Sequence, residues 1–205
     1  MPKIVDWDAR RDEILAATWR VIARDGLDKT TVRAIAREAG CSQGILAHYF
    51  DDKDDILAKA LVMSHRRVRR RTAEKTDGVR GLDALRIAML EALPLDAERA
   101  VEAQIEVSFW GRMLADDTLV ELQRSEVDTL RSRLRGHLEE AQELSELRPD
   151  LVIEVAVHEL MVLNDGLSVQ FVHDPDRVPA DRQLLLLDQL LERFQGQTQR
   201  PAGRA

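Results

Sequence analysis

Residues 30–53 read TTVRAIAREAGCSQGILAHYFDDK and predict two short helices joined by a tight turn. Thr31 can cap the first helix, in which apolar residues recur at helical spacing. Gly40 can end that helix because glycine adopts a left-handed backbone conformation at no steric cost. Ser42 can accept hydrogen bonds from the free N–H groups of the second helix, which we expect to reach about Phe50. Two short helices around a glycine-containing turn are the recurrent device for placing a helix in the major groove of DNA.

A helical hairpin packed in a protein core is the alternative interpretation of this stretch. We disfavour it because the second helix carries a face of polar or small residues, namely Gln43, Gly44, Ala47 and His48. A helix packed on all sides in a protein core would carry larger apolar side chains on that face. The only cysteine, Cys41, lies in the turn, where packing is a simpler role than redox sensing.

Composition and charge are those of a soluble globular protein of 205 residues, with 44% hydrophobic and 33% charged residues. A single cysteine excludes an intramolecular disulfide, and neither a secretory signal nor a membrane-spanning run is present, so we expect a cytoplasmic protein without a membrane partner. The net charge is −7, but residues 1–75 hold 16 Lys and Arg against 12 Asp and Glu, whereas the remainder holds 14 against 25. A basic N-terminal part can meet phosphate while the acidic remainder stays away from it.

The periodicity elsewhere predicts an all-α fold of about nine helices and no strands. Besides the two motif helices, we expect helices over residues 10–25, 53–74, 82–93, 96–114, 117–146, 150–173 and 180–195. An N-terminal unit of three helices (residues 1–52) is followed by a larger helical unit (53–195) and by a disordered tail (196–205). Two glycines in residues 76–81 indicate a joint.

Two C-terminal segments, residues 152–171 and 184–194, predict helices with apolar residues around nearly their whole circumference. Such helices must be covered on several sides, either as central core helices of one chain or in a bundle between two chains. The position of the second segment near the C-terminus favours the bundle between two chains.

The motif belongs to a longer stretch that resembles the DNA-binding domain of the tetracycline-repressor (TetR) family of bacterial transcription regulators. The matching segments are ILAATWRVIARDG (14–26), TTVRAIAREAGCS (30–42) and GILAHYFDDKDDIL (44–57). The segments FWGRML (109–114) and LNDGLSVQF (163–171) are similar to the choline-responsive, betaine-pathway repressor subgroup. The resemblance implies a repressor that binds double-stranded operator DNA with a palindromic sequence. It further implies a homodimer joined through the last two helices and released by a small-molecule effector. An architectural DNA-binding protein without a small-molecule ligand is the alternative.

Helical geometry and the resemblance together select the residues that would contact DNA. Leu46 and Phe50 should face inward, in a small core shared with Trp19, and leave Gln43 on the opposite face. The amide of Gln43 can pair with N6 and N7 of adenine. The candidate DNA-contacting residues are Thr31, Arg33, Ser42, Gln43, Gly44, Ala47, His48, Tyr49 and Lys53.

The contact expected of each residue differs. Tyr49 and Lys53 match positions that contact phosphate in the family, and such contacts fix register without reading sequence. Arg33 suits either a guanine edge or a phosphate, and His48 suits either half-buried packing or a phosphate. Ala47 takes the place of a tyrosine found in many family members, so one aromatic contact is missing here.

The basic run HRRVRRR, residues 65–71, lies at the far end of a helix that, by resemblance, leads away from DNA. We expect a solvated charge face or contacts with the acidic body rather than DNA contact.

An effector pocket in the larger domain is also implied by the resemblance. Its candidate residues are Glu106, Phe109, Trp110 and Met113 on one helix, and His158, Met161, Asn164, Asp165 and Phe171 on another. Trp110 with Glu106 or Asp165 can hold a cation through its ring face and the opposite charge. The alternative is that this stripe is ordinary core.

Catalysis is disfavoured by the motifs that are missing. His158-Glu159 lacks the second histidine of a zinc-protease helix, and the sequence contains neither a glycine-rich phosphate loop nor a nucleophile elbow. We therefore expect no enzyme, no catalytic residues, no metal site and no cofactor.

Overall fold

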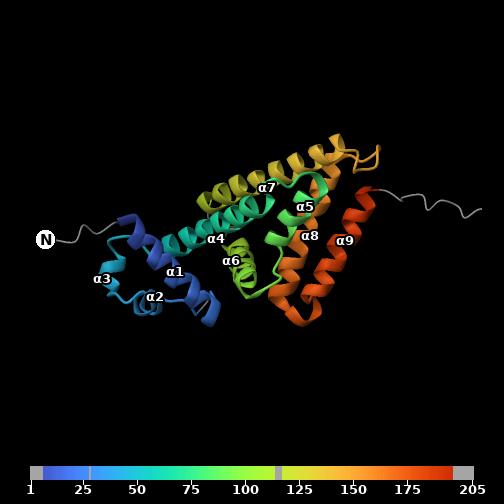
Figure 1. Ribbon diagram of the computed structural model, residues 1–205. Helices are drawn as coiled ribbons and strands as arrows, with labels where there is room; N and C mark the ends of the chain where they lie inside the picture. Colours follow the sequence, from blue (N-terminus) through green and yellow to red (C-terminus); the bar gives the residue numbers. More distant parts are fainter. Residues whose placement is uncertain (1–6, 28, 114–116, 196–205) are drawn as a thin grey trace, which may run out of the picture.

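The computed structural model describes residues 7–27, 29–113 and 117–195, which form an elongated array of helices (Figure 1). The side chains of residues 111–113, 117–119 and 122 lie outside the description. The helices are α1 (Trp7–Asp25), α2 (Val32–Glu38), α3 (Gln43–Leu46), α4 (Lys53–Thr76), α5 (Gly81–Ala92), α6 (Ala97–Met113), α7 (Asp117–Glu143), α8 (Ile153–His173) and α9 (Ala180–Gln195). A 3₁₀ turn, η1 (Pro175–Arg177), precedes α9. The described residues contain no strand, which confirms the predicted all-α class. The tail predicted to be disordered, residues 196–205, lies outside the described residues.

The helix-turn-helix forms through the capping contacts expected from the sequence. Thr31 and Ser42 each accept a hydrogen bond from the backbone N–H three residues later, at 3.1 and 3.3 Å. Gly40 has φ of +62°, and the N–H after it donates to the carbonyl oxygen of Ala36 at 2.9 Å. This left-handed residue closes α2 and turns the chain toward α3.

The second motif helix is shorter than predicted. The α-helix ends at Leu46 rather than near Phe50, and the N–H groups of residues 48 and 49 donate to carbonyls three residues back, at 3.1 and 2.9 Å. Asp52 caps α4 by accepting a backbone hydrogen bond at 2.8 Å. The residues between α3 and this cap form a tighter turn instead of a further turn of α-helix.

The N-terminal helices share a core with the beginning of α4. This core consists of Ile14, Leu15, Ile35, Ala36, Leu46, Phe50, Ile56 and Ala60. Ile56 and Ala60 come from α4, beyond the predicted end of the first unit at residue 52. We use "headpiece" for α1–α3 with the first turns of α4, and "body" for α5–α9.

A second apolar cluster joins the headpiece to the body. Its members are Ile22, Leu57, Leu61, Val101, Ile105 and Phe109, from α1, α4 and α6. Trp19 packs partly buried against this cluster, with the guanidinium of Arg67 5.0 Å from its ring centroid. The prediction that Trp19 joins Leu46 and Phe50 is therefore wrong. Periodicity placed its ring inward but did not distinguish between two inward neighbours.

The body packs α5 against α7, and α8 against α6, α7 and α9. The glycine-containing segment 76–81 is the turn between α4 and α5, with φ of +72° at Gly78 and +60° at Gly81. In Figure 1 the headpiece lies at one end of the molecule and α8 and α9 lie at the other, with α4 running from the headpiece into the body. None of the described helices is long and apolar enough to cross a bilayer.

Candidate DNA-binding surface and ligand cavity

The short helix α3 presents its predicted reading face to solvent. Gln43, Gly44, Ala47 and His48 are exposed, while Leu46 is buried beneath them at 2% exposure. His48 is thus exposed rather than half-buried. A Cβ added at Gly44 would meet only a side-chain oxygen at 3.8 Å, so packing does not require glycine there. The missing side chain leaves the backbone open to close approach by a ligand.

The flanking candidates divide by burial. Thr31, Arg33 and Ser42 are exposed, whereas Tyr49 and Lys53 are half-buried. Arg33 and Lys53 have no ion-pair partner among the described residues, so both cations are available to an anionic partner.

Packing accounts for two further residues near the motif. The ring of Tyr49 lies 4.8 Å from the ring of Trp7, centroid to centroid. This contact orients the phenol at the end of the motif. Cys41 is a free thiol, partly buried against the headpiece core, as expected for a packing role.

Four residues of the basic run of α4 contact the body, whereas Arg66 and Arg70 are exposed. His65, Arg67, Arg69 and Arg71 pair with Glu106, Glu98, Glu126 and Glu102, respectively. The expectation of contacts with the acidic body is therefore confirmed. These pairs fasten the second half of α4 to α6 and α7.

A cavity of about 280 Å³ lies among α4, α6, α7 and α8. Five of the predicted pocket residues line it: Glu106, Trp110, Met161, Asn164 and Asp165. Its volume is near the lower end of the range of small-molecule sites, roughly 300–1,000 Å³. The structure thus brings together most of the polar groups that the sequence assigned to a pocket.

The other predicted pocket residues lie elsewhere. Phe109 is 1% exposed in the cluster between headpiece and body, because its position on α6 faces α1 and α4. His158 is exposed on α8, and Phe171 packs against the body core. Their assignments to the cavity are wrong. The side chain of Met113 lies outside the description.

Glu106 is the most connected group of the cavity. It accepts hydrogen bonds from Nε2 of His65 at 2.7 Å, from Nε1 of Trp110 at 3.3 Å and from the amide of Gln123. Burial opposes its charge, but these hydrogen bonds, with His65 foremost, hold the pKa of Glu106 below its usual range. Glu106 is thus a carboxylate kept ionised inside the protein.

Asp165 has a different environment. Burial raises the pKa of Asp165, and its only hydrogen bond among the described residues comes from Nδ2 of Asn164 at 3.3 Å. No cation pairs with it in this part of the structure. A partly buried carboxylate without a counter-charge favours binding of a cation.

Sequence reasoning missed the charged residues that α4 and α7 contribute to the cavity. These are His65, Arg69, Glu126 and Arg133. The single apolar residue of the run 65–71, Val68, was a signal, because it lines the cavity together with Ser64 and His65. Nothing in the sequence around Arg133 distinguished it from the solvent-facing arginines of the same helix.

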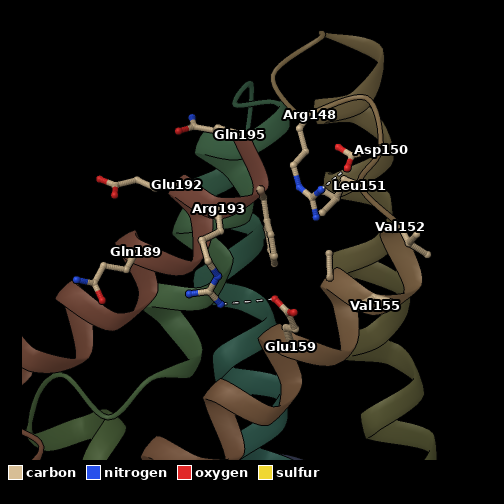
Figure 2. Close-up of a pocket in the computed structure, with 12 residues that line it drawn as sticks. Arg148, Asp150, Leu151, Val152, Val155, Glu159, Gln189, Glu192, Arg193 and Gln195 are labelled. Atoms are coloured by element: carbon tan, nitrogen blue, oxygen red, sulfur yellow. Dashed lines mark hydrogen bonds and ion pairs between the residues drawn. The ribbon is translucent and has the colours of Figure 1, made fainter. Parts of the chain in front are cut away.

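A wide groove of about 1070 Å³ opens between the beginning of α8 and the end of α9 (Figure 2). Val152 and Val155 at this groove are 59% and 55% exposed, and Arg193 of α9 pairs with Glu159 of α8 at 3.7 Å. Exposed apolar side chains continue along both helices, at Val162, Val169, Leu185 and Leu186. A surface that exposes several apolar side chains on neighbouring helices is typical of a surface that another molecule covers.

Two family models match the chain. Residues 14–60 match the model of bacterial regulatory proteins of the tetR family, and residues 81–196 match the C-terminal domain of BetI-type transcriptional repressors. The HTH-type transcriptional regulator PksA of Bacillus subtilis is 31% identical, over 89% of this chain and 88% of that protein. The HTH-type transcriptional regulator BetI of Vibrio parahaemolyticus is 27% identical, over 94% of this chain and 96% of that protein.

Solved structures share the fold. A transcriptional regulator from Rhodococcus sp. Rha1 is 29% identical with a TM-score of 0.77, over 90% of this chain and 95% of that one. A putative transcriptional regulator from Saccharomonospora viridis, in complex with choline, has a TM-score of 0.83 at 22% identity, over 90% of this chain and 96% of that one. The family models, the relatives and the exposed helix-turn-helix agree, and the chain belongs to the TetR family of transcription regulators, with a C-terminal domain of the BetI repressor type.

Proposed function

We propose that this protein represses transcription by binding a palindromic operator as a homodimer, and that a small cationic molecule in the cavity releases it. The observation that carries the proposal is that α4 belongs to both sites. Ile56 and Ala60 lie in the headpiece core, while His65 and Arg69 of the same helix line the cavity. A ligand that rearranges the contacts of His65 and Arg69 therefore acts on the helix that carries the headpiece.

The DNA contacts follow from the exposed face of α3. Gln43 reads an adenine in each half-site, and Gly44 and Ala47 allow close approach to the base edges. Arg33 and Lys53, which have no ion-pair partner among the described residues, hold the backbone phosphates. The remaining DNA contacts come from the ends of the motif helices, at Thr31, Ser42, His48 and Tyr49.

The dimer forms through α8 and α9 of two protomers. The exposed valines of α8 and leucines of α9 supply the apolar surface that a four-helix bundle between chains would bury. Because these helices lie at the end of the molecule opposite the headpiece (Figure 1), pairing through them leaves both reading helices uncovered. Palindromic half-sites one helical turn apart, or a multiple of it, match such a pair.

The ligand is held at the acidic side of the cavity. Glu106 is ionised, Asp165 has no cationic partner among the described residues, and Trp110 offers a ring face to a cation. The solved relative with choline makes a quaternary ammonium a suitable first probe. A cation beside Glu106 competes with His65 for the carboxylate and so weakens a contact between α4 and α6. The ligand releases DNA only if it binds the DNA-incompetent arrangement more tightly.

The test begins with selection of bound fragments from random DNA, which should yield a palindrome. Choline is then titrated into the complex, with release followed by fluorescence anisotropy and binding by the melting temperature of the free protein. Glu106→Gln should bind the selected DNA normally but require at least about tenfold more choline for release. Glu121→Gln, at an exposed position of α7, is the matched control and should release normally.

Three results would contradict the proposal. A selected sequence without two-fold symmetry would exclude binding as a dimer to paired half-sites. Release that is equally sensitive in Glu106→Gln and in the control would exclude the cavity as the ligand site. If no cation in a panel of ammonium compounds raises the melting temperature, the architectural alternative without a ligand is favoured instead.

A further inference from the structure

Arg133 is a cation of the cavity lining that has no partner among the described residues. It extends from α7, lines the cavity and is partly buried, and no hydrogen bond or ion pair joins it to another described residue. Burial and the neighbouring charge of Arg69 lower its pKa, and the charge of Glu126 offsets them only in part. A partly buried guanidinium without an acceptor leaves its five N–H donors available to an anionic group of a ligand.

The carboxylates near Arg133 already have partners. Glu126 pairs with Arg69 and also lies 3.7 Å from Nδ1 of His65. On the opposite wall, Glu102 of α6 is held by both terminal nitrogens of Arg71, at 2.8 and 2.6 Å. The cavity wall formed by α4 and α7 therefore carries one positive charge more than its carboxylates neutralise.

The wall formed by α6 and α8 carries more negative charge than its cations neutralise. Asp165 has no cationic partner among the described residues, and Glu106 is ionised. A simple cation would pair with Asp165 and leave Arg133 without an anion, and a simple anion would do the reverse. Only a ligand that bears both charges satisfies both walls of a cavity of about 280 Å³.

We propose that the effector is a small zwitterion whose ammonium group lies among Glu106, Trp110 and Asp165 and whose carboxylate is bound by Arg133. The inference rests on the proposed function, because it concerns the ligand of the same cavity. It adds a specificity-determining residue: Arg133 distinguishes a zwitterion from a plain quaternary ammonium by a fork of two parallel hydrogen bonds to the carboxylate.

The experiment is isothermal titration calorimetry on the full chain with four probes. Choline is the plain cation, trimethylglycine and 4-trimethylammoniobutanoate are zwitterions with one and three methylenes between the charges, and butanoate is the plain anion. At least one zwitterion should bind about tenfold or more tightly than choline, because a bidentate charge-assisted pair is added. Butanoate should bind least well.

Three variants localise the effect. Arg133→Met should abolish the preference for the zwitterion and leave choline affinity within about threefold of the unmodified protein. Arg124→Met, at an exposed position of the same helix, should retain the preference. Asp165→Asn should weaken choline and zwitterions alike. Because Arg133 lacks a partner, Arg133→Met should also melt at an unchanged or higher temperature without ligand.

The possible failures are distinguishable. Choline that binds as tightly as both zwitterions, or a zwitterion preference that survives Arg133→Met, overturns the inference and leaves the proposed function in place. A large loss of melting temperature in unliganded Arg133→Met also overturns it, because Arg133 would then have a partner within the protein. Absence of binding by all four probes contradicts both the inference and the cationic effector.

Discussion

Substitution of Arg71 by methionine should destabilise the protein by an amount that depends on pH. Arg71 holds both oxygens of Glu102 and, through Nε, an oxygen of Glu91 at 3.0 Å. Glu91 keeps Lys75 at 2.6 Å and Arg99 at 3.5 Å as partners, so the substitution isolates Glu102 rather than Glu91. The side chain of Glu102 is only 8% exposed.

The size of the destabilisation follows from leaving the carboxylate of Glu102 without a partner. Removing one partner of a buried ion pair costs about 3–5 kcal/mol, and the 16% exposure of Arg71 places this site near the lower value. Adding Glu102→Leu to Arg71→Met removes the stranded charge, so the double variant should return to within about 1 kcal/mol of the unmodified protein. Arg70→Met, at a 72% exposed position of the same helix, should change stability by less than about 1 kcal/mol.

The pH dependence has a definite sign. Burial already raises the pKa of Glu102 in the folded protein, and loss of Arg71 should raise it further. A carboxyl group whose folded pKa lies above its unfolded pKa binds protons preferentially in the folded state, so its penalty is present at high pH and disappears as the pH falls through the folded pKa. The destabilisation by Arg71→Met should therefore be smaller at pH 5 than at pH 7.

Urea unfolding, followed by circular dichroism at both pH values, measures these differences for the four proteins of the double-mutant cycle. The reasoning is refuted if the coupling energy between Arg71 and Glu102 is near zero. It is equally refuted if Arg71→Met loses as much stability at pH 5 as at pH 7.

Three further substitutions test the DNA contacts and the joint between headpiece and body. Lys53→Ala should weaken binding to all DNA sequences alike and reduce the slope of log K against log salt by about 1; an unchanged slope in anisotropy titrations would remove Lys53 from the phosphate contacts. Gln43→Ala should lose about 1–3 kcal/mol at one base position in each half-site, which binding to a set of single-base operator variants measures; a uniform loss at every position would contradict base reading. Phe109→Ala should lower the free energy of unfolding by about 3–5 kcal/mol, because its ring is 1% exposed among α1, α4 and α6. A loss below about 1 kcal/mol in urea unfolding would place that ring outside the packed cluster.

Local signals explain why the headpiece could be predicted in detail. The caps at Thr31 and Ser42 and the left-handed Gly40 each depend on a few neighbouring residues, and all three occur in the structure. The end of α3 was predicted too late because Leu46 and Phe50 keep the apolar spacing of a helix, while the backbone between them has already tightened to hydrogen bonds that reach three residues back. Apolar periodicity does not distinguish these two backbone geometries.

Partners across the fold could not be predicted in the same way. Periodicity indicated that Trp19 and Phe109 face inward, but an inward face on α6 borders both the cavity and the headpiece. The cavity residues on α6 and α8 were found because an aromatic ring and carboxylates share helical faces there. Those on α4 and α7 were missed because their partners are distant in sequence, as for Arg69 and Glu126, 57 residues apart.

The ion pairs of α4 also change how DNA affinity should be understood. The positive balance of residues 1–75 comes from residues 65–75, which hold six Lys and Arg and one Glu, since residues 1–64 hold 10 Lys and Arg against 11 Asp and Glu. Most of that basic run is paired with the body, so it adds little to the field at the headpiece. Attraction to DNA must then come from a few local donors, with Arg33, Lys53 and the N-termini of the motif helices foremost. In a headpiece so close to neutrality, each phosphate contact is a large part of the total, and for this reason one lysine is expected to change the salt dependence measurably.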